Sequence, residues 1–332
     1  MTKPTIYALG FFDGVHLGHQ ALLFACRHLA ERNACNAGVI TFTTHPDSLV
    51  TGISPCLLNT AQDRRLLLCG YQMSTVLEIP FNEELMHTHW STFLEDLVAQ
   101  GAGGFVCGSD FRFGAGGNGT AKKLESFCKA RNLPYAIVPQ QQIDGVRVSS
   151  TYVRELIAQG EMEKANAFLG HPHTLSGEVV HGRGLGHTIG IPTANLNLPE
   201  GIICPKYGVY ACKAIVDGKE YPAVTNVGTR PTVNGENVTV KPWLLDFEGD
   251  LYGKELRLLF YKFLRPEQKF DSLVELQAEI RKNGEQTRKF FEKSESKCFT
   301  FGKNYDIIIA LALAGQYFYA RSSVLGRHRP FT

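Results

Sequence analysis

The sequence lacks the patterns that mark several classes of protein. Its nine cysteines include no C-x-x-C pair with metal-ligand spacing, so neither a zinc site nor a disulfide framework is indicated. The longest apolar run, residues 307–314, falls far short of the roughly 20 residues that span a bilayer. A formal net charge of +2 argues against a large basic surface for nucleic acid. The first residues show no secretory signal, because their apolar run is short and broken by Asp13. We therefore expect a cytoplasmic globular protein with reduced thiols.

The chain has 332 residues, which is more than one hydrophobic core usually holds and suits two domains. In the first half, short apolar runs of strand length alternate with helix-like stretches. This alternation predicts a parallel sheet covered by helices on both faces. Ligands bind such sheets beyond the carboxyl ends of the strands. The expected strands are residues 6–12, 38–42, 76–79, 105–107 and 135–138.

The pattern changes after about Gly170. Closely spaced strands with Gly and Pro between them predict a small antiparallel β-barrel. Asp217 and Gly218 predict a tight hairpin within it, because both tolerate the positive φ of a type I′ turn. Apolar residues at helical spacing predict a helix over residues 272–292. The predicted division of the chain is a first domain at 1–170, a second at 171–296, and a basic tail at 297–332.

Residues 10–19, GFFDGVHLGH, are the most specific feature of the first half. They follow the first expected strand, and their three glycines let the backbone approach a ligand closely. The helix that this turn opens favours phosphate at its amino-terminal amides. His16 and His19 are three residues apart, so they face the same way on the first helical turn. Two imidazoles beside bound phosphates can donate hydrogen bonds to charge that grows in a phosphoryl-type transition state.

This turn resembles the signature of nucleotidyltransferases that adenylylate or cytidylylate a phosphorylated substrate, and its F-D-G-V-H form is typical of FAD synthetase. Residues 107–114, CGSDFRFG, and 148–160, VSSTYVRELIAQG, resemble two later segments of the same enzymes, and residues 41–46 match a third less specifically. The resemblance implies a Rossmann-like nucleotidyltransferase α/β domain. The residues that it places at the ATP and FMN sites are Gly10, Phe11, Asp13, Gly14, Asp110, Phe111, Ser150 and Thr151.

The implied reaction is attack of the FMN phosphate on the α-phosphorus of ATP, with Mg²⁺ accompanying the ATP and pyrophosphate leaving. Such an enzyme mostly positions the reactants and neutralises charge, so no covalent nucleophile is needed. By resemblance, His16 and His19 contact the reacting phosphates and Arg154 contacts the pyrophosphate. Asp13 and Asp110 fit a polar contact to the ligand and a turn or helix-cap role equally well.

Residues 177–196, GEVVHGRGLGHTIGIPTANL, are the most specific stretch of the second half. Their glycines imply a loop that wraps phosphates with backbone amides, although no Walker motif follows. The stretch resembles the riboflavin kinase signature. Most of residues 5–292 therefore resembles the bacterial bifunctional riboflavin kinase/FAD synthetase family, which implies a riboflavin-kinase-like barrel with a C-terminal helix. By this resemblance Thr193 and Asn195 help to hold Mg²⁺, which prefers oxygen ligands. The expected ATP and flavin contacts of the barrel are Gly182, Gly184, Gly186, Gly190, Pro192 and Arg288.

Lys241 departs from the family pattern. The family carries a Glu at this place, and it is read as the base that deprotonates the ribityl hydroxyl. An ammonium group cannot accept a proton, and nearby ATP phosphates would keep it charged. If residues 241–246 are extended, Asp246 points to the opposite face. Because loss of a general base commonly costs on the order of 10²–10⁴-fold, we expect an impaired or silent kinase half.

Two other regions differ from the family. Asn283 stands where an Asp is frequent, while Arg288 keeps the expected basic position, where a flavin contact and a solvated role fit equally well. Residues 297–332 match nothing in the family. Within them residues 307–320 are apolar enough to pack as a helix, and we assign the tail no function.

Three interpretations stay open. The first is an enzyme with two ATP sites that makes FMN and FAD, and the second is an FAD synthetase whose kinase-like domain only binds flavin. The third, a non-catalytic flavin- or nucleotide-binding protein, conflicts with the intact His16, His19 and Arg154. A cytidylyltransferase is less consistent with the kinase-like second half. The expected partners are ATP, FMN and riboflavin, with no nucleic acid and no membrane span, and the sequence leaves a homo-oligomer open.

Overall fold

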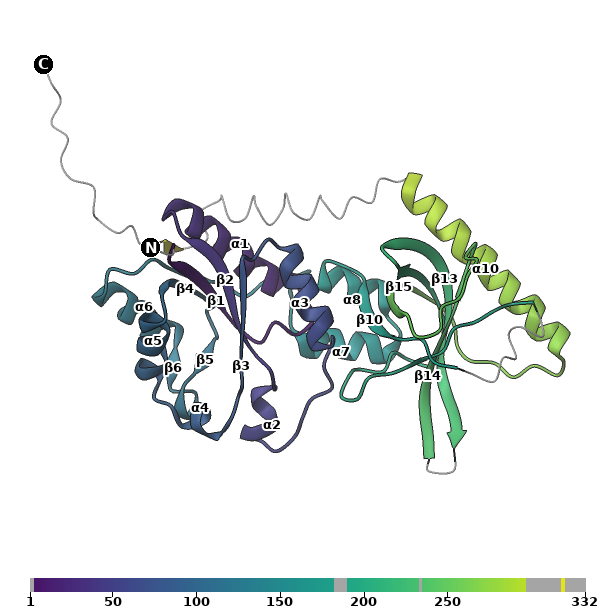
Figure 1. The fold of residues 1–332 in the computed structure, drawn as a ribbon, viewed down its shortest axis with the longest axis horizontal. Coiled ribbons are helices and arrows are strands. Elements are labelled where there is room, and N and C mark those ends of the chain that lie inside the picture. The colour runs from purple at the N-terminus through teal and green to yellow at the C-terminus, as the bar shows by residue number, and fades with distance from the viewer. Residues whose placement is uncertain (1–2, 182–189, 233–234, 297–317, 320–332) are drawn as a thin grey trace, which may run out of the picture.

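The computed structural model describes residues 3–181, 190–232, 235–296 and 318–319. They form two lobes that lie side by side, an α/β domain and a β-barrel, with helices α7 and α8 between them (Figure 1). The long helix α10 (Leu273–Ser296) lies along the side of the barrel that faces away from the α/β domain.

The α/β domain is built on a sheet with the order β7-β4-β1-β2-β3. All neighbouring pairs among these strands are parallel, as the sequence predicts. The order reverses between β1 and β4, so a crevice for ligands is expected at the carboxyl ends of these two strands. The strands are β1 (Thr5–Leu9), β2 (Asn36–Phe42), β3 (Thr75–Ile79), β4 (Ala102–Gly108) and β7 (Tyr135–Val138).

Helices cover both faces of this sheet, because apolar side chains alternate along its strands. Ile6 and Ala8 pack with α1 on one face, and Phe105 and Cys107 pack with α5 and α6 on the other. The helices of the domain are α1 (Leu17–Arg32), α2 (Pro46–Val50), α3 (Ala61–Gly70), α4 (Glu83–His87), α5 (Trp90–Ala99), α6 (Ala121–Ala130), α7 (Ser150–Gln159) and α8 (Met162–Leu169). Two short hairpins, β5–β6 (Arg112–Phe113, Gly119–Thr120) and β8–β9 (Gln142–Ile143, Val146–Arg147), complete it.

The second lobe is an antiparallel sheet with the order β10-β15-β12-β13-β14-β11. An isolated bridge between Val179 and Leu196 joins its two edges, so the sheet is a nearly closed barrel. The small antiparallel barrel with a C-terminal helix is therefore confirmed. The strands are β10 (His173–Glu178), β11 (Leu196–Asn197), β12 (Gly208–Val216), β13 (Lys219–Thr232), β14 (Gly235–Leu244) and β15 (Glu255–Arg265).

The predicted hairpin at Asp217 and Gly218 is confirmed, since the two residues join β12 to β13 with φ angles of 50° and 76°. Other boundaries differ. The first strand ends at Leu9 and not at Phe12, because Phe12 has a φ of 60° and turns the chain. The last helix continues to Ser296.

The tail was expected to contain a helix over residues 307–320. Residues 307–317 and 320 lie outside the described part of the chain. Phe318–Tyr319 form β16, a short strand that pairs antiparallel with β7, so the helical prediction is wrong for these two residues. Pairing to an open sheet edge overrode the local apolar pattern.

The two lobes share one hydrophobic core. Val153 and Leu156 of α7 and Phe168 of α8 belong to the same buried cluster as Tyr210 and Phe260 of the barrel. Backbone pairing between Leu57 and residues 201–203 adds hydrogen bonds across the junction. This packing fixes the barrel on the end of the α/β domain.

Candidate functional site

The turn after β1 has an unusual backbone. Phe12, Gly14 and Val15 all have positive φ angles, of 60°, 75° and 39°. A Cβ on Gly14 would lie 2.5 Å from Cδ1 of the buried Leu58, so this position requires glycine for both conformation and space. Strained backbone of this kind persists only where the surrounding structure holds it.

Four side chains hold this turn by its carbonyl oxygens. Thr41 donates to Phe11 at 2.8 Å, Ser150 to Asp13 at 3.0 Å and Gln20 to Val15 at 2.9 Å, while His171 Nε2 lies 2.9 Å from the Gly14 oxygen. They come from β2, α7, α1 and the start of the second lobe. Because its carbonyls are bound to the protein, the turn keeps one shape before any ligand arrives.

His16 and His19 lie face to face at the start of α1. Their ring centroids are 3.7 Å apart at an interplanar angle of 11°, as the predicted shared face requires. His16 Nδ1 accepts the amide proton of His19 at 3.2 Å, so the ring proton of neutral His16 is on Nε2. Burial lowers the pKa of His16 to about 3 and that of His19 well below its usual 6.5. The pair therefore consists of neutral hydrogen-bond donors at neutral pH.

Asp13 and Arg154 form an ion pair beside these histidines. Arg154 Nη1 lies 2.7 Å from Asp13 Oδ2, and the Leu58 amide donates to Asp13 Oδ1 at 2.8 Å. Burial raises the pKa of Asp13, while the Leu58 amide and the Arg154 charge oppose that shift. The contact places the guanidinium of α7 against the turn of β1, although the two residues are 141 positions apart in the chain.

The segment after β4 reaches the same edge of the sheet. Asp110 is exposed and forms an ion pair with Arg147, whose charge acts on the ring of His16. Phe111 stacks on Phe113 with ring centroids 5.5 Å apart. Residues 10–19 and 107–114 and the start of residues 148–160, the three segments selected from the sequence, thus meet beyond the carboxyl ends of β1 and β4.

Several residues at this site were not selected from the sequence. The ring centroids of His45 and Phe11 lie 4.6 Å apart in an edge-to-face arrangement, and the segment of His45, residues 41–46, matches the family less specifically. Gln20 and His171 hold the turn through buried contacts that no local pattern reveals. Arg64 is 1% exposed and has its guanidinium 4.4 Å from the centre of the Phe11 ring, but its sequence context is an ordinary helix.

The barrel carries a cavity of about 320 Å³ at the end of the glycine-rich segment. Gly190 has a φ of 64°, and Gly182, Gly184 and Gly186 lie outside the described residues. Thr193 and Pro192 reach the cavity, whereas Asn195 is not part of its wall and its backbone oxygen accepts from Val180. Residues of the wall include Val179, Pro192, Thr193, Phe247, Asp250 and Tyr252.

Lys241 lies on β14 directly opposite Asn226 of β13 and is half-buried. The condition that residues 241–246 are extended is not met, because β14 ends at Leu244 and Asp246 has a φ of 62°. Strand alternation therefore does not determine the face of Asp246. The exposed Asp246 carboxylate instead forms a two-point ion pair with Arg288 of α10. This pair holds α10 to the end of the strand.

No group of three or more His, Cys, Asp or Glu side chains suited to a metal ion occurs within the described ranges. The neutral oxygens of Thr193 and Asn195 are the donors that remain from the sequence prediction. Both side chains are half-buried on the segment that leads into β11. Such a donor set suits a Mg²⁺ ion that arrives with the phosphates of a nucleotide.

The fold and the first site define a two-domain transferase that uses nucleotides. A parallel sheet places a glycine turn, paired histidines and an arginine at its switch point, and a barrel adds a second cavity. Models of two families match the chain, FAD synthetase over residues 1–152 and riboflavin kinase over residues 169–291. The chain belongs to the bifunctional riboflavin kinase/FMN adenylyltransferase family.

Curated relatives match along most of their length. The bifunctional riboflavin kinase/FMN adenylyltransferase of Listeria monocytogenes is 34% identical over 294 residues, which cover 87% of this chain and 93% of that protein. The protein of the same name from Escherichia coli K12 is 36% identical over 86% of this chain and 92% of its own.

A solved structure shares the arrangement of both lobes. It is a crystal structure from Streptococcus pneumoniae whose title names a macrolide-efflux protein. Its TM-score is 0.78 at 28% identity, and the match covers 87% of this chain and 95% of that one. In the part of the present chain that the structure describes, we find no helix with the length and apolarity to cross a membrane.

Proposed function

We propose that the protein makes FAD from FMN and ATP at the end of β1, in residues 1–170, and that residues 171–296 form its riboflavin kinase half. The observation that carries the first activity is the stacked, neutral pair of His16 and His19 on a turn that four side chains hold in place. Residues 297–332 receive no role in this proposal.

The first reaction follows from how these groups are arranged. The FMN phosphate attacks the α-phosphorus of ATP, and pyrophosphate leaves. His16 donates from Nε2 to a reacting phosphate, because its Nδ1 is occupied by the His19 amide. Arg154 and Thr151, whose side chains are 3.3 Å apart, receive the pyrophosphate. By resemblance, Gly10, Phe11, Gly14 and Phe111 contact the ATP or the FMN. Asp13 is paired with Arg154, Asp110 is paired with Arg147, and Ser150 donates to the Asp13 carbonyl.

For the second reaction, ATP would occupy the barrel cavity beside Pro192 and Thr193. Thr193 and Asn195 would hold Mg²⁺, which supplies charge neutralisation at the phosphates. By resemblance, Arg288 and the glycines of residues 182–190 would contact the ATP or the flavin. Lys241 cannot accept the ribityl proton while it is charged, so we propose that this half turns over slowly or only binds flavin.

The second candidate function is thus an FAD synthetase that depends on FMN from another source. Lys241 is the specific observation that favours it. A cytoplasmic location fits both candidates, since the cysteines in the described part of the chain are free thiols. ATP, FMN and riboflavin are the partners of either enzyme.

The test supplies purified protein and MgATP with riboflavin in one reaction and FMN in another, and separates the flavins by chromatography. FAD from FMN with little or no product from riboflavin is the expected result. Lys241→Glu should then raise FMN formation by about 10²-fold or more. Lys219→Glu, on the exposed β12–β13 hairpin, is the matched control and should change nothing. An ordinary rate of FMN formation by the unmodified protein would show that Lys241 does not impair the kinase.

A second comparison tests the histidines. His16→Ala should lower the rate of FAD formation by about 10²–10³-fold, the usual cost of one donor to a developing charge. His28→Ala removes an exposed imidazole from the same helix and should leave the rate unchanged. Equal effects of the two changes would contradict the assignment.

A further inference from the structure

Arg64 projects from α3 toward the turn after β1. Its side chain is 1% exposed, which is rare for an arginine. Nη2 donates to the backbone oxygen of Phe42 at 3.0 Å, and the guanidinium lies 4.4 Å from the centre of the Phe11 ring. These contacts place a buried positive charge against the turn after β1, where the proposed reaction binds its phosphates.

The nearby carboxylates do not balance this charge. Asp13 and Glu78 are the acidic groups whose charges act on Arg64. Asp13 is already paired with Arg154, and Glu78 is paired with Arg65. His16 and His19, the other titratable groups near the turn, are neutral because burial lowers their pKa values. Arg64, Arg65 and Arg154 together carry one positive charge more than Asp13 and Glu78 neutralise, although Arg65 is exposed and Glu78 Oε1 is buried without a hydrogen-bond partner in the described structure.

Two polar atoms beside the turn are also unused. Arg64 Nε and His19 Nδ1 are both buried and have no hydrogen-bond partner among the described residues. A buried donor without a partner costs about 1–3 kcal/mol, and more when it is charged. An anionic ligand bound here would accept hydrogen bonds from these donors and balance the excess positive charge, and it would therefore remove this cost.

We propose that Arg64 is a further anion-binding residue of the adenylyltransferase site, and that it contacts a phosphate group of ATP or FMN. The inference rests on the proposed function for the identity of the ligand. Three observations support a contact between Arg64 and an anion: the guanidinium lies over the Phe11 ring, its Nε has no hydrogen-bond partner among the described residues, and the nearby carboxylates do not balance its charge. The fork of an arginine suits phosphate better than a lysine does, because it can donate two parallel hydrogen bonds.

The test measures phosphate binding apart from turnover. Isothermal titration of the unmodified protein and of Arg64→Met uses ATP, FMN and inorganic pyrophosphate separately, so the ligand whose affinity changes identifies the contacted phosphate. We expect about ten- to hundredfold weaker binding of one of them. The melting temperature of the unliganded variant should stay the same or rise, because an unbalanced buried charge has been replaced by an apolar chain of similar length.

Arg131→Met is the matched control. Arg131 also lies over a phenylalanine, 3.9 Å from the Phe127 ring centre, but it lies at the surface after α6, where it forms an ion pair with Glu95. It should leave all three affinities unchanged. If Arg64→Met binds every ligand as tightly as the unmodified protein, the proposal is wrong and Arg64 only supports the turn.

Arg64→Lys decides the matter if the methionine variant does not fold. Lysine keeps the charge and loses the fork, so an intermediate loss of affinity is expected, and unchanged affinity would overturn the proposal. The same experiment distinguishes a failure of this inference from a failure of the proposed function. Loss of pyrophosphate binding in Arg64→Met, in a protein that forms no FAD from FMN, would support the inference and contradict the adenylyl transfer.

Discussion

Buried histidines are the main feature of this protein at the scale of single residues. His173 on β10 is 1% exposed, and neither ring nitrogen has a hydrogen-bond partner in the described structure. Burial lowers its pKa to about 3, the same direction and cause as for His16. Both residues are thus kept neutral by the fold and would bind a proton readily in the unfolded chain.

This difference predicts a dependence of stability on pH. Between about pH 3 and about pH 6.5 the unfolded state binds more protons at these two positions than the folded state does, so the free energy of unfolding falls as the pH falls. Each histidine contributes up to about 1.4 kcal/mol per pH unit. Urea unfolding from about pH 7 to about pH 5 should show a smaller loss in His173→Leu than in the unmodified protein. Identical pH slopes for the two proteins would mean that His173 does not contribute.

Gly14 gives a second prediction at this scale. Gly14→Ala should destabilise the protein by more than about 2 kcal/mol, because it combines a φ of 75° with a Cβ 2.5 Å from Leu58. Gly10→Ala is the comparison, since the nearest atoms to its Cβ would belong to the Phe12 ring, at 3.1 Å, and its φ is outside the left-handed region. Thermal unfolding measures both. A Gly14 variant as stable as the Gly10 variant would contradict the strained turn.

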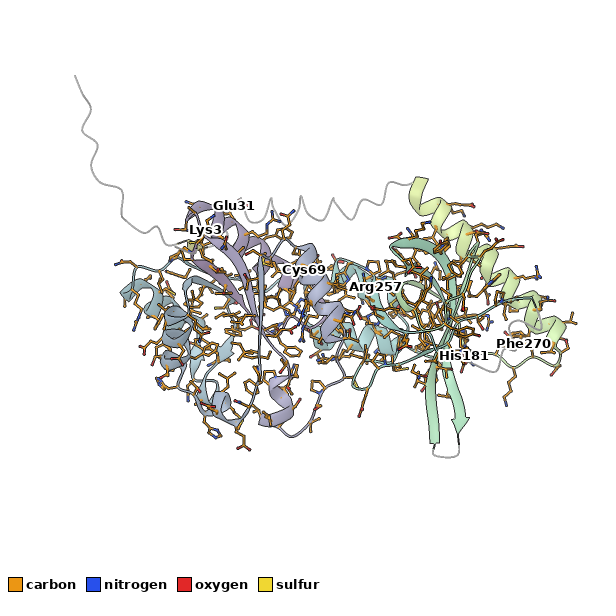
Figure 2. The ribbon with its side chains drawn as sticks, in the orientation of Figure 1. Lys3, Glu31, Cys69, His181, Arg257 and Phe270 are labelled. Carbon is orange, nitrogen blue, oxygen red and sulfur yellow. The ribbon has the colours of Figure 1, made fainter. Side chains whose placement is uncertain are left out.

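Helix α3 contacts both halves of the molecule. Its neighbouring residues point to different partners: Arg64 reaches the turn after β1, while Asp63 reaches the barrel. Asp63 is 1% exposed and accepts from the backbone amide and the hydroxyl of Ser176 on β10. Arg257 of β15, which lies at the junction of the lobes in Figure 2, approaches the same carboxylate at 3.8 Å.

Because Asp63 is buried, the loss of one partner should be costly. Ser176→Ala removes a donor from a charged group away from water and should lower the free energy of unfolding by about 1–3 kcal/mol. Gln62→Ala removes a contact to Glu255 at the same interface, but both side chains are exposed, so less than about 0.5 kcal/mol is expected. Urea unfolding of the two variants compares them directly. A larger effect from Gln62→Ala would show that the exposed contacts hold the domains together.

At the scale of the whole molecule, the shared hydrophobic core predicts cooperative unfolding. Side chains of α7 and α8 pack with those of the barrel in one buried cluster, which is more than a flexible linker between domains provides. Unfolding one lobe would expose apolar surface of the other. The two lobes should therefore unfold in one transition.

The two tryptophans of the chain allow a direct test, because Trp90 lies in the α/β domain and Trp243 in the barrel. Trp243→Phe leaves a probe of the first lobe, and Trp90→Phe leaves a probe of the second. Fluorescence during urea unfolding should give coincident midpoints for both variants, after correction for any change in stability seen by circular dichroism. Clearly separated midpoints would show that the lobes unfold independently.

The sequence by itself determined the features that depend on a few neighbouring residues. Apolar runs that alternate with helix-like stretches were enough to predict the parallel sheet. The Asp217–Gly218 pair predicted the hairpin between β12 and β13, and the spacing of His16 and His19 predicted their shared face. The family motifs also selected Arg154, which the fold brings to Asp13. These properties are local, because backbone conformation and helical periodicity are set over one or two turns of chain.

Only the tertiary structure decided which distant groups hold the site. Ser150 and Asp13 are 137 residues apart, His171 and Gly14 are 157 apart, and Ser176 and Asp63 are 113 apart. Asp246 and Arg288 of α10 likewise form an ion pair across 42 positions of the chain. No local pattern specifies such contacts, because each depends on two segments that become neighbours only when the sheet and the barrel pack together.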